Sequence, residues 1–189
     1  MPAGSDLTVN LHYTTSGLAI TDRPKIGFTV AKTRPAKRLV SQAGESSDAV
    51  GQAPNARNIA IPPFEGNYLG PLQVINFPRD IELVRLRPHA HVRGKSVQYK
   101  LIYPDGREEI LLNVPRYDFN WQLTYKTSKL IPKGSRVEVQ FHYDNSTANK
   151  YNPDPAGWVY YGLQSWEEMG SPFLGFLIPS SENERDYLR

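Results

Sequence analysis

Short stretches of alternating apolar and polar residues, separated by turn residues, recur along the chain from Asn58 onward. No long pattern of helical period accompanies them, and Pro104-Asp105-Gly106 predicts a tight turn because proline presets φ and glycine accepts positive φ. The pattern predicts an all-β protein, an antiparallel jelly-roll β-sandwich. The expected strands cover residues 73–77, 81–86, 96–103, 109–114, 121–127, 136–143 and 158–164.

The first third of the chain has a different pattern. Residues 7–13 and 26–31 alternate as strands do, whereas the following residues as far as 57 are polar and aperiodic. Two strands are too few for a stable domain. We therefore expect residues 1–35 to be the last strands of a truncated jelly-roll domain, followed by a linker over 36–57, a complete domain over 58–179 and a tail over 180–189.

Composition narrows the functional classes. The chain has 39% hydrophobic and 22% charged residues and no apolar run of membrane-spanning length, so we expect a globular protein without a membrane partner. The absence of cysteine excludes disulfides and thiolate metal sites. The net charge of +3 is mild and its basic residues are scattered, so no nucleic-acid partner is expected.

The segment Arg87-Pro88-His89-Ala90-His91 directly follows an expected strand. Residues two apart in an extended chain lie on the same face, about 6.6 Å apart at their Cα atoms, so the two imidazoles can converge on one metal ion. Two imidazoles alone admit zinc, copper, iron or nickel, whereas a thioether selects reduced copper. Apart from Met1, the chain has one methionine, Met169.

Residues 87–94 and the later Gln164-Ser165-Trp166-Glu167-Glu168-Met169 resemble the copper type II, ascorbate-dependent monooxygenases. That family includes peptidylglycine alpha-hydroxylating monooxygenase and dopamine beta-monooxygenase. Residues 114–122 and 143–146 resemble its bacterial members. The resemblance covers residues 58 to 179 and corresponds to the C-terminal catalytic domain.

The resemblance implies that His89, His91 and Met169 ligate a catalytic copper where dioxygen binds. It further implies hydroxylation of a C–H bond in a small organic substrate, with ascorbate as reductant. Relatives of this kind favour a periplasmic or secreted location, although no signal peptide is visible in the sequence.

Members of the family carry a second copper in the preceding domain, held by three histidines, one of which lies in the pattern Val-x-x-His-Tyr. Residues 9–13 have this form, so the resemblance makes His12 a ligand of that second site. The adjacent pair that supplies the other two ligands has no counterpart here. We therefore expect a missing N-terminal copper domain in the parent protein and an incomplete catalytic cycle in this chain alone.

Arg87 corresponds to the arginine that holds the substrate carboxylate in the peptide hydroxylase. Ser171 and Phe173 stand where that enzyme has an asparagine and a tyrosine. A peptidylglycine substrate is therefore not expected, and Arg87 is either a contact for another anion or a solvated charge.

Several alternatives stay open at this level. The chain could be a non-catalytic copper-binding domain, or a β-sandwich binding module that has lost its metal. His142 alternates with apolar neighbours and is expected to be a polar strand residue or a hydrogen-bond partner of a ligand. Tyr117, Asp118, Asn120 and Gln122 either shape the entrance of the site or form a loop that bonds its own backbone.

Overall fold

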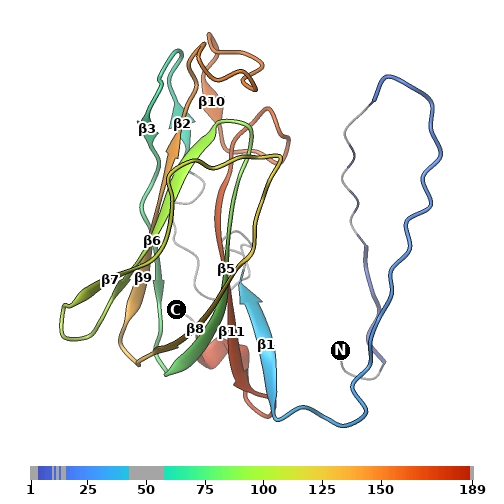
Figure 1. Ribbon diagram of the computed structural model, residues 1–189, viewed down its shortest axis with the longest axis vertical. Coiled ribbons are helices and arrows are strands. Elements are labelled where there is room, and N and C mark those ends of the chain that lie inside the picture. The colour runs from blue at the N-terminus through green and yellow to red at the C-terminus, as the bar shows by residue number, and fades with distance from the viewer. Residues whose placement is uncertain (1–3, 10, 12, 14–15, 43–57, 188–189) are drawn as a thin grey trace. The chain divides into compact units, whose positions relative to one another are not determined.

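The computed structural model describes residues 4–9, 11, 13, 16–42 and 58–187 (Figure 1). The chain divides into two compact units, Met1–Arg34 and Pro35–Arg189. The described residues of the first unit contain no strand, in contrast to the strands expected over 7–13 and 26–31. Apolar side chains such as Val9, Phe28 and Val30 are exposed there. An alternating pattern forms a stable strand only when a sheet is present to pair with it.

The second unit is a jelly roll, which confirms the predicted all-β antiparallel sandwich. One sheet has the order β1-β11-β5-β8, and the other has β9 between β6 and the short strands β3 and β4, with β7 at its far edge. Every pairing between named strands is antiparallel. The strands are β1 (Lys37–Gln42), β2 (Ala60–Ile61), β3 (Tyr68–Leu69), β4 (Gln73–Asn76), β5 (Ile81–Ala90), β6 (Gly94–Ile102), β7 (Glu108–Val114), β8 (Tyr125–Ile131), β9 (Arg136–Tyr143), β10 (Val159–Tyr160) and β11 (Gly170–Pro179).

The core lies between the two sheets and follows the period-2 alternation of the strands. Buried positions alternate with partly exposed positions along β5 and β9. The core side chains include Leu83, Leu86, Leu174, Phe176 and Ile178 from one sheet and Tyr99, Leu101, Val137, Val139 and Phe141 from the other. The alternate residues of β5 therefore project from the outer face of its sheet.

Four strands, β1, β2, β3 and β11, were not expected from the sequence. The strands expected over 121–127 and 158–164 are displaced to β8 and shortened to β10, respectively. Residues 37–42 were expected within the linker. They form β1, and all six pair with residues 174–179 of β11. Residues 170–179, for which no strand was expected, form β11 at the centre of the first sheet. The run Phe173 to Ile178 is almost continuously apolar and buried, so it lacks the alternation by which half-exposed strands are recognised.

The expected tail also belongs to the folded unit. It contains the 3₁₀ turn η1 (Glu184–Asp186), and Tyr187 is buried against the core. No described helix has the length and apolar character needed to cross a membrane.

Candidate metal centre

The two histidines and Met169 belong to neighbouring backbone segments, where β5 ends and β11 begins. Gly170 is paired with Ala90, and Ser171 is paired with His89. Paired residues of antiparallel strands share a face, as do residues two apart on one strand. Extending this register by one residue beyond Ala90 and Gly170 brings the backbone of Met169 beside that of His91.

The two imidazole rings lie next to each other. Their centroids are 5.3 Å apart and their planes are inclined by 79°. His91 and Met169 are buried, and His89 is partly exposed. The structure thus brings the two imidazoles together and brings the segment that carries Met169 to the same corner of the sheet. His12, the predicted ligand of a second site, lies outside the described residues.

Hydrogen bonds fix which nitrogen of each ring is available. His89 Nδ1 lies 2.6 Å from Gln122 Oε1, and His91 Nδ1 lies 3.2 Å from the carbonyl oxygen of Glu167. Gln122 Nε2 donates to the carbonyl oxygen of Phe119, which orients the amide so that its oxygen faces His89. Both histidine partners are acceptors, so each Nδ1 carries the proton and each Nε2 keeps a lone pair for a ligand.

The surroundings keep both rings uncharged near neutral pH. Burial lowers the pKa of His89, and the nearby Arg87 charge lowers it further, against the opposing effect of the hydrogen bond that His89 donates to Gln122. Burial also lowers the pKa of His91, as does the neighbouring His89. Neutral imidazole is the form that binds a metal ion, so little proton release is needed for ligation.

The loop between β7 and β8 covers the segment that carries the histidines. The amide of Ala90 donates to the Tyr117 hydroxyl at 3.0 Å, and that hydroxyl donates to the carbonyl oxygen of Ala90 at 2.8 Å. The paired segment of β5 and β8 ends at Leu86, so Tyr117 takes the place of a neighbouring strand beside Ala90. Phe119 completes the cover, with its ring 6.2 Å from that of His91.

Gly94 makes room for this arrangement. A Cβ atom there would lie 2.7 Å from both Ala90 Cβ and Tyr117 Cδ1. Of the polar loop residues singled out from the sequence, Tyr117 and Gln122 contact the histidine segment. Asp118 accepts from the amide of Asn120 within the loop, as the local alternative expected.

Glu168 joins the two strands beneath the site and was not predicted. Its carboxylate accepts from the backbone amides of His91 at 2.5 Å, Met169 at 2.8 Å and Arg93 at 3.0 Å. The side chain is fully buried, which raises the pKa of Glu168 to about 7 against the opposing effect of the three amides. One oxygen thus holds the backbone of a predicted imidazole ligand next to that of the predicted sulfur ligand.

Arg93 is a second buried charged residue behind the site. Its guanidinium donates to Asn145 Oδ1 at 2.8 Å and to the carbonyl oxygen of Trp166 at 2.7 Å. It therefore ties the turn after β5 to the segment that leads to Met169. The motif around His89 contained Arg93, but no local feature of the sequence indicates that this arginine is buried.

His142 lies away from the site. It belongs to β9 in the other sheet and alternates with core residues, so it faces outward on the opposite side of the sandwich. Its Nδ1 atom is buried and has no hydrogen-bond partner in the described part of the chain. This placement excludes ligation of the same ion as His89 and His91.

The available donors match a soft metal ion. Among the described residues, no group of three His, Cys, Asp or Glu side chains could hold a metal. The candidate donors carried by the backbone segments at this corner are the two imidazoles and the thioether of Met169. Thioether ligands favour copper in its reduced state over zinc or magnesium, so the residues fit copper(I).

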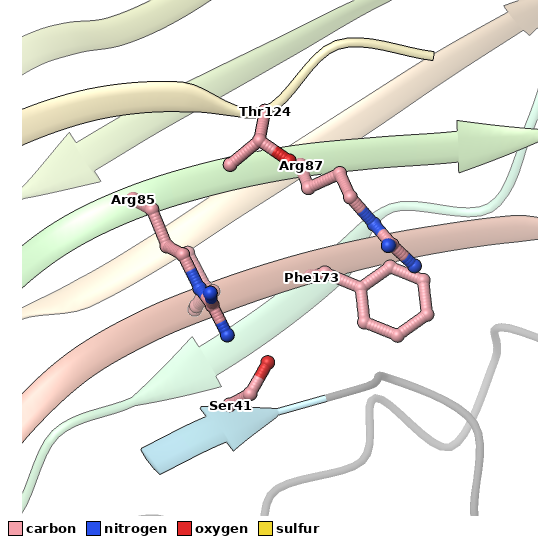
Figure 2. Close-up of a pocket in the computed structure, with 6 residues that line it drawn as sticks. Ser41, Arg85, Arg87, Thr124 and Phe173 are labelled. Carbon is pink, nitrogen blue, oxygen red and sulfur yellow. The ribbon is translucent and has the colours of Figure 1, made fainter. Parts of the chain in front are cut away.

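A small pocket lies on the same outer face. It has a volume of about 140 Å³ and is lined by Ser41, Arg85, Arg87, Thr124, Phe173 and Leu174 (Figure 2). The Arg87 guanidinium carbon lies 4.5 Å from the centre of the Phe173 ring. The same ring lies 6.3 Å from His89, so it links the pocket to the histidine pair.

Comparison with known proteins leaves the family open. No family model matches the chain, and no curated protein matches it. Similar solved structures include infectious bursal disease virus Gx strain, with a TM-score of 0.33 and 11% identity over 80% of this chain and 34% of that one. The Gt strain gives a TM-score of 0.31 and 11% identity over 87% and 38% of the two chains.

The chain thus spans less than two-fifths of the length of these viral proteins. TM-scores this low carry no functional argument, and the jelly-roll assignment rests on the strand order itself. Membership of the copper monooxygenase family therefore stays a prediction from sequence motifs.

Proposed function

We propose that this chain is the oxygen-activating domain of an ascorbate-dependent copper monooxygenase. One observation supports the proposal: two adjacent imidazoles have their Nδ1 atoms hydrogen-bonded to carbonyl oxygens, and Met169 directly precedes Gly170, the strand partner of Ala90. His89 and His91 would hold copper through Nε2, and Met169 would supply the sulfur. Copper bound there would supply activation of dioxygen for insertion into a substrate C–H bond.

The protein groups around the site have separate tasks. Gln122 and the Glu167 carbonyl hold the ring orientations, which keeps the Nε2 lone pairs directed at the ligand position. The burial of His91 and Met169 limits water access from one side. Arg87, stacked on Phe173, would contact the substrate. By resemblance, His12 would serve a second copper site in the parent protein, and ascorbate would supply the electrons.

Copper(I) titration against a chromogenic chelator tests the ligand set. We expect one ion per molecule of this 189-residue chain, with affinity about 10-fold lower or worse in His89→Ala, His91→Ala and Met169→Leu. His142→Ala is the matched control because it removes a histidine from the other sheet. X-ray absorption should show one sulfur neighbour of copper that is lost in Met169→Leu. Wild-type protein without a sulfur neighbour would refute the ligand assignment.

A turnover assay distinguishes a copper monooxygenase from a non-catalytic copper-binding domain. Dioxygen consumption is measured with ascorbate and candidate substrates, using copper-loaded protein and the three variants. Substrate-dependent consumption that disappears in His89→Ala supports the proposal. Stoichiometric copper uptake without such consumption by the parent protein would instead identify a non-catalytic copper-binding domain.

A further inference from the structure

Two residues that line the pocket beside the histidine pair, Ser41 and Arg85, lie in one row across the β1-β11-β5-β8 sheet. Ser41 pairs with Gly175, Gly175 pairs with Arg85, and Arg85 pairs with Lys126. Gly175 has no side chain, and a Cβ atom there would collide with the side chain of Arg85. The pocket therefore exists because Arg85 lies over a glycine and points toward Ser41 (Figure 2).

Positive charge accumulates in and beside this pocket without compensation. Arg85 and Arg87 are two residues apart on one strand, so they share a face, and Lys126 is directly across from Arg85. Like charges directly opposite each other destabilise a sheet. In the part of the chain that the structure describes, no carboxylate forms an ion pair with any of these three cations. Glu82, the acid of the same strand, is paired with Lys37 at 2.7 Å.

We infer that this pocket binds a compact dianionic oxyanion, with the phosphate monoester as its chemical class. Two guanidinium groups present several N–H donors each, and such groups bind phosphate oxygens in pairs. The hydroxyl groups of Ser41 and Thr124 line the same pocket and can donate to further oxygens. A doubly charged group would neutralise both arginines, whereas a single carboxylate would leave one charge uncompensated.

The position of the pocket indicates what the rest of the ligand contacts. Phe173 lies under Arg87 and beside His89, so an apolar group attached to the anion would lie on Phe173 and extend toward the histidine pair. Treating this ligand as the substrate rests on the proposed function. The anion site itself depends only on the arginines and the pocket, and is tested without metal.

The experiment measures binding of benzyl phosphate and phenylacetate to the metal-free 189-residue chain by calorimetry. At pH 7.5 we expect benzyl phosphate to bind about 10-fold more tightly than phenylacetate. Arg85→Gln and Arg87→Gln should each weaken benzyl phosphate about 10-fold. Arg107→Gln should have no effect, because Arg107 lies at the β6–β7 turn and contacts Tyr103. Thermal unfolding confirms that each variant is folded, and Ser41→Ala provides a milder change in the same pocket.

Two further measurements complete the test: the pH dependence of the affinity and the NMR signals of His89. The affinity for benzyl phosphate should fall between pH 7.5 and pH 5, since a phosphate monoester loses its second charge near pH 6 whereas arginine stays protonated. Benzyl phosphate should shift the NMR signals of the His89 ring more than inorganic phosphate does, because its ring lies on Phe173 beside His89. Equal affinity for phenylacetate, unchanged affinity in Arg85→Gln, or no shift of His89 would each overturn the inference. None of these results depends on copper, so they are separable from failure of the monooxygenase proposal.

Discussion

Tyr117 holds the backbone between the two histidines through a single hydroxyl group. In Tyr117→Phe, the amide and carbonyl of Ala90 lose their partner, and we expect the free energy of unfolding to fall by about 1–3 kcal/mol. We also expect weaker copper(I) binding, because the segment that carries both imidazoles is no longer fixed. Chemical denaturation and metal titration measure the two effects.

Tyr125→Phe is the matched control for that change. The Tyr125 hydroxyl has no hydrogen bond within the described residues, and its side chain packs against the same core. Its removal should leave both measurements nearly unchanged. Equal behaviour of the two variants would show that the Tyr117 hydroxyl does not position the histidines.

Gln122 sets the tautomer of His89. In Gln122→Leu, the His89 Nδ1 proton loses its acceptor at 2.6 Å, so both tautomers become accessible and Nε2 is no longer the only free nitrogen. We expect copper(I) affinity to fall about 10–100-fold, the usual effect of removing such a partner. The ¹⁵N NMR shifts of the His89 ring in the metal-free protein identify its tautomer directly. Gln98→Leu, an exposed change on β6, should alter neither quantity.

At the scale of single residues, the spacing of His89 and His91 was sufficient to predict a shared face. Their partners were not predictable in the same way. Tyr117 and Gln122 lie 27 and 33 positions from the residues they bond, so their roles depend on the path of the β7–β8 loop. The sequence of a polar loop does not show whether its side chains hydrogen-bond to the loop's own backbone or to a distant strand.

At the scale of elements, Glu168 links the turn after β5 to the start of β11. Glu168→Ala leaves three buried amides without an acceptor, and we expect a loss of about 3 kcal/mol or more in unfolding free energy. In a domain of this size, the melting temperature should fall by about 5–10 °C. Differential scanning calorimetry measures this fall in melting temperature. Glu167→Ala, which removes an exposed acceptor of the Gln164 amide, should cost less than about 1 kcal/mol.

β11 shows why the element list from sequence was incomplete. It lies between β1 and β5, and most of its residues are buried on both faces. Such a strand has no polar alternation, and its sequence is compatible with a buried segment of any kind. The ligand-bearing ends of β5 and β11 were therefore visible as motifs, while the pairing that joins them was not.

At the scale of the whole molecule, the unit boundary predicts the effect of truncation. Because residues 1–34 and 35–189 form separate compact units, a chain starting at Pro35 should unfold cooperatively, with a melting temperature within about 3 °C of the full chain. A chain starting at Asn58, the boundary expected from the sequence pattern, lacks β1. It leaves one edge of β11 unpaired, so it should be destabilised and prone to aggregate.

Calorimetry and light scattering of the two truncated chains decide between these boundaries. Equal stability would show that β1 contributes little to the sandwich. Loss of cooperative unfolding in both chains would show that the first unit is required for folding.

By itself, the sequence determined the fold class, most strands of the sandwich and the shared face of the two histidines. These features depend on local alternation, turn residues and the period of an extended chain, which are properties of neighbouring residues. Only the tertiary structure decided that β1 and β11 complete the first sheet, that Glu168 holds His91 beside Met169, and that Arg85 lies over Gly175. Each of these depends on strand register between distant segments, and no local pattern encodes that register.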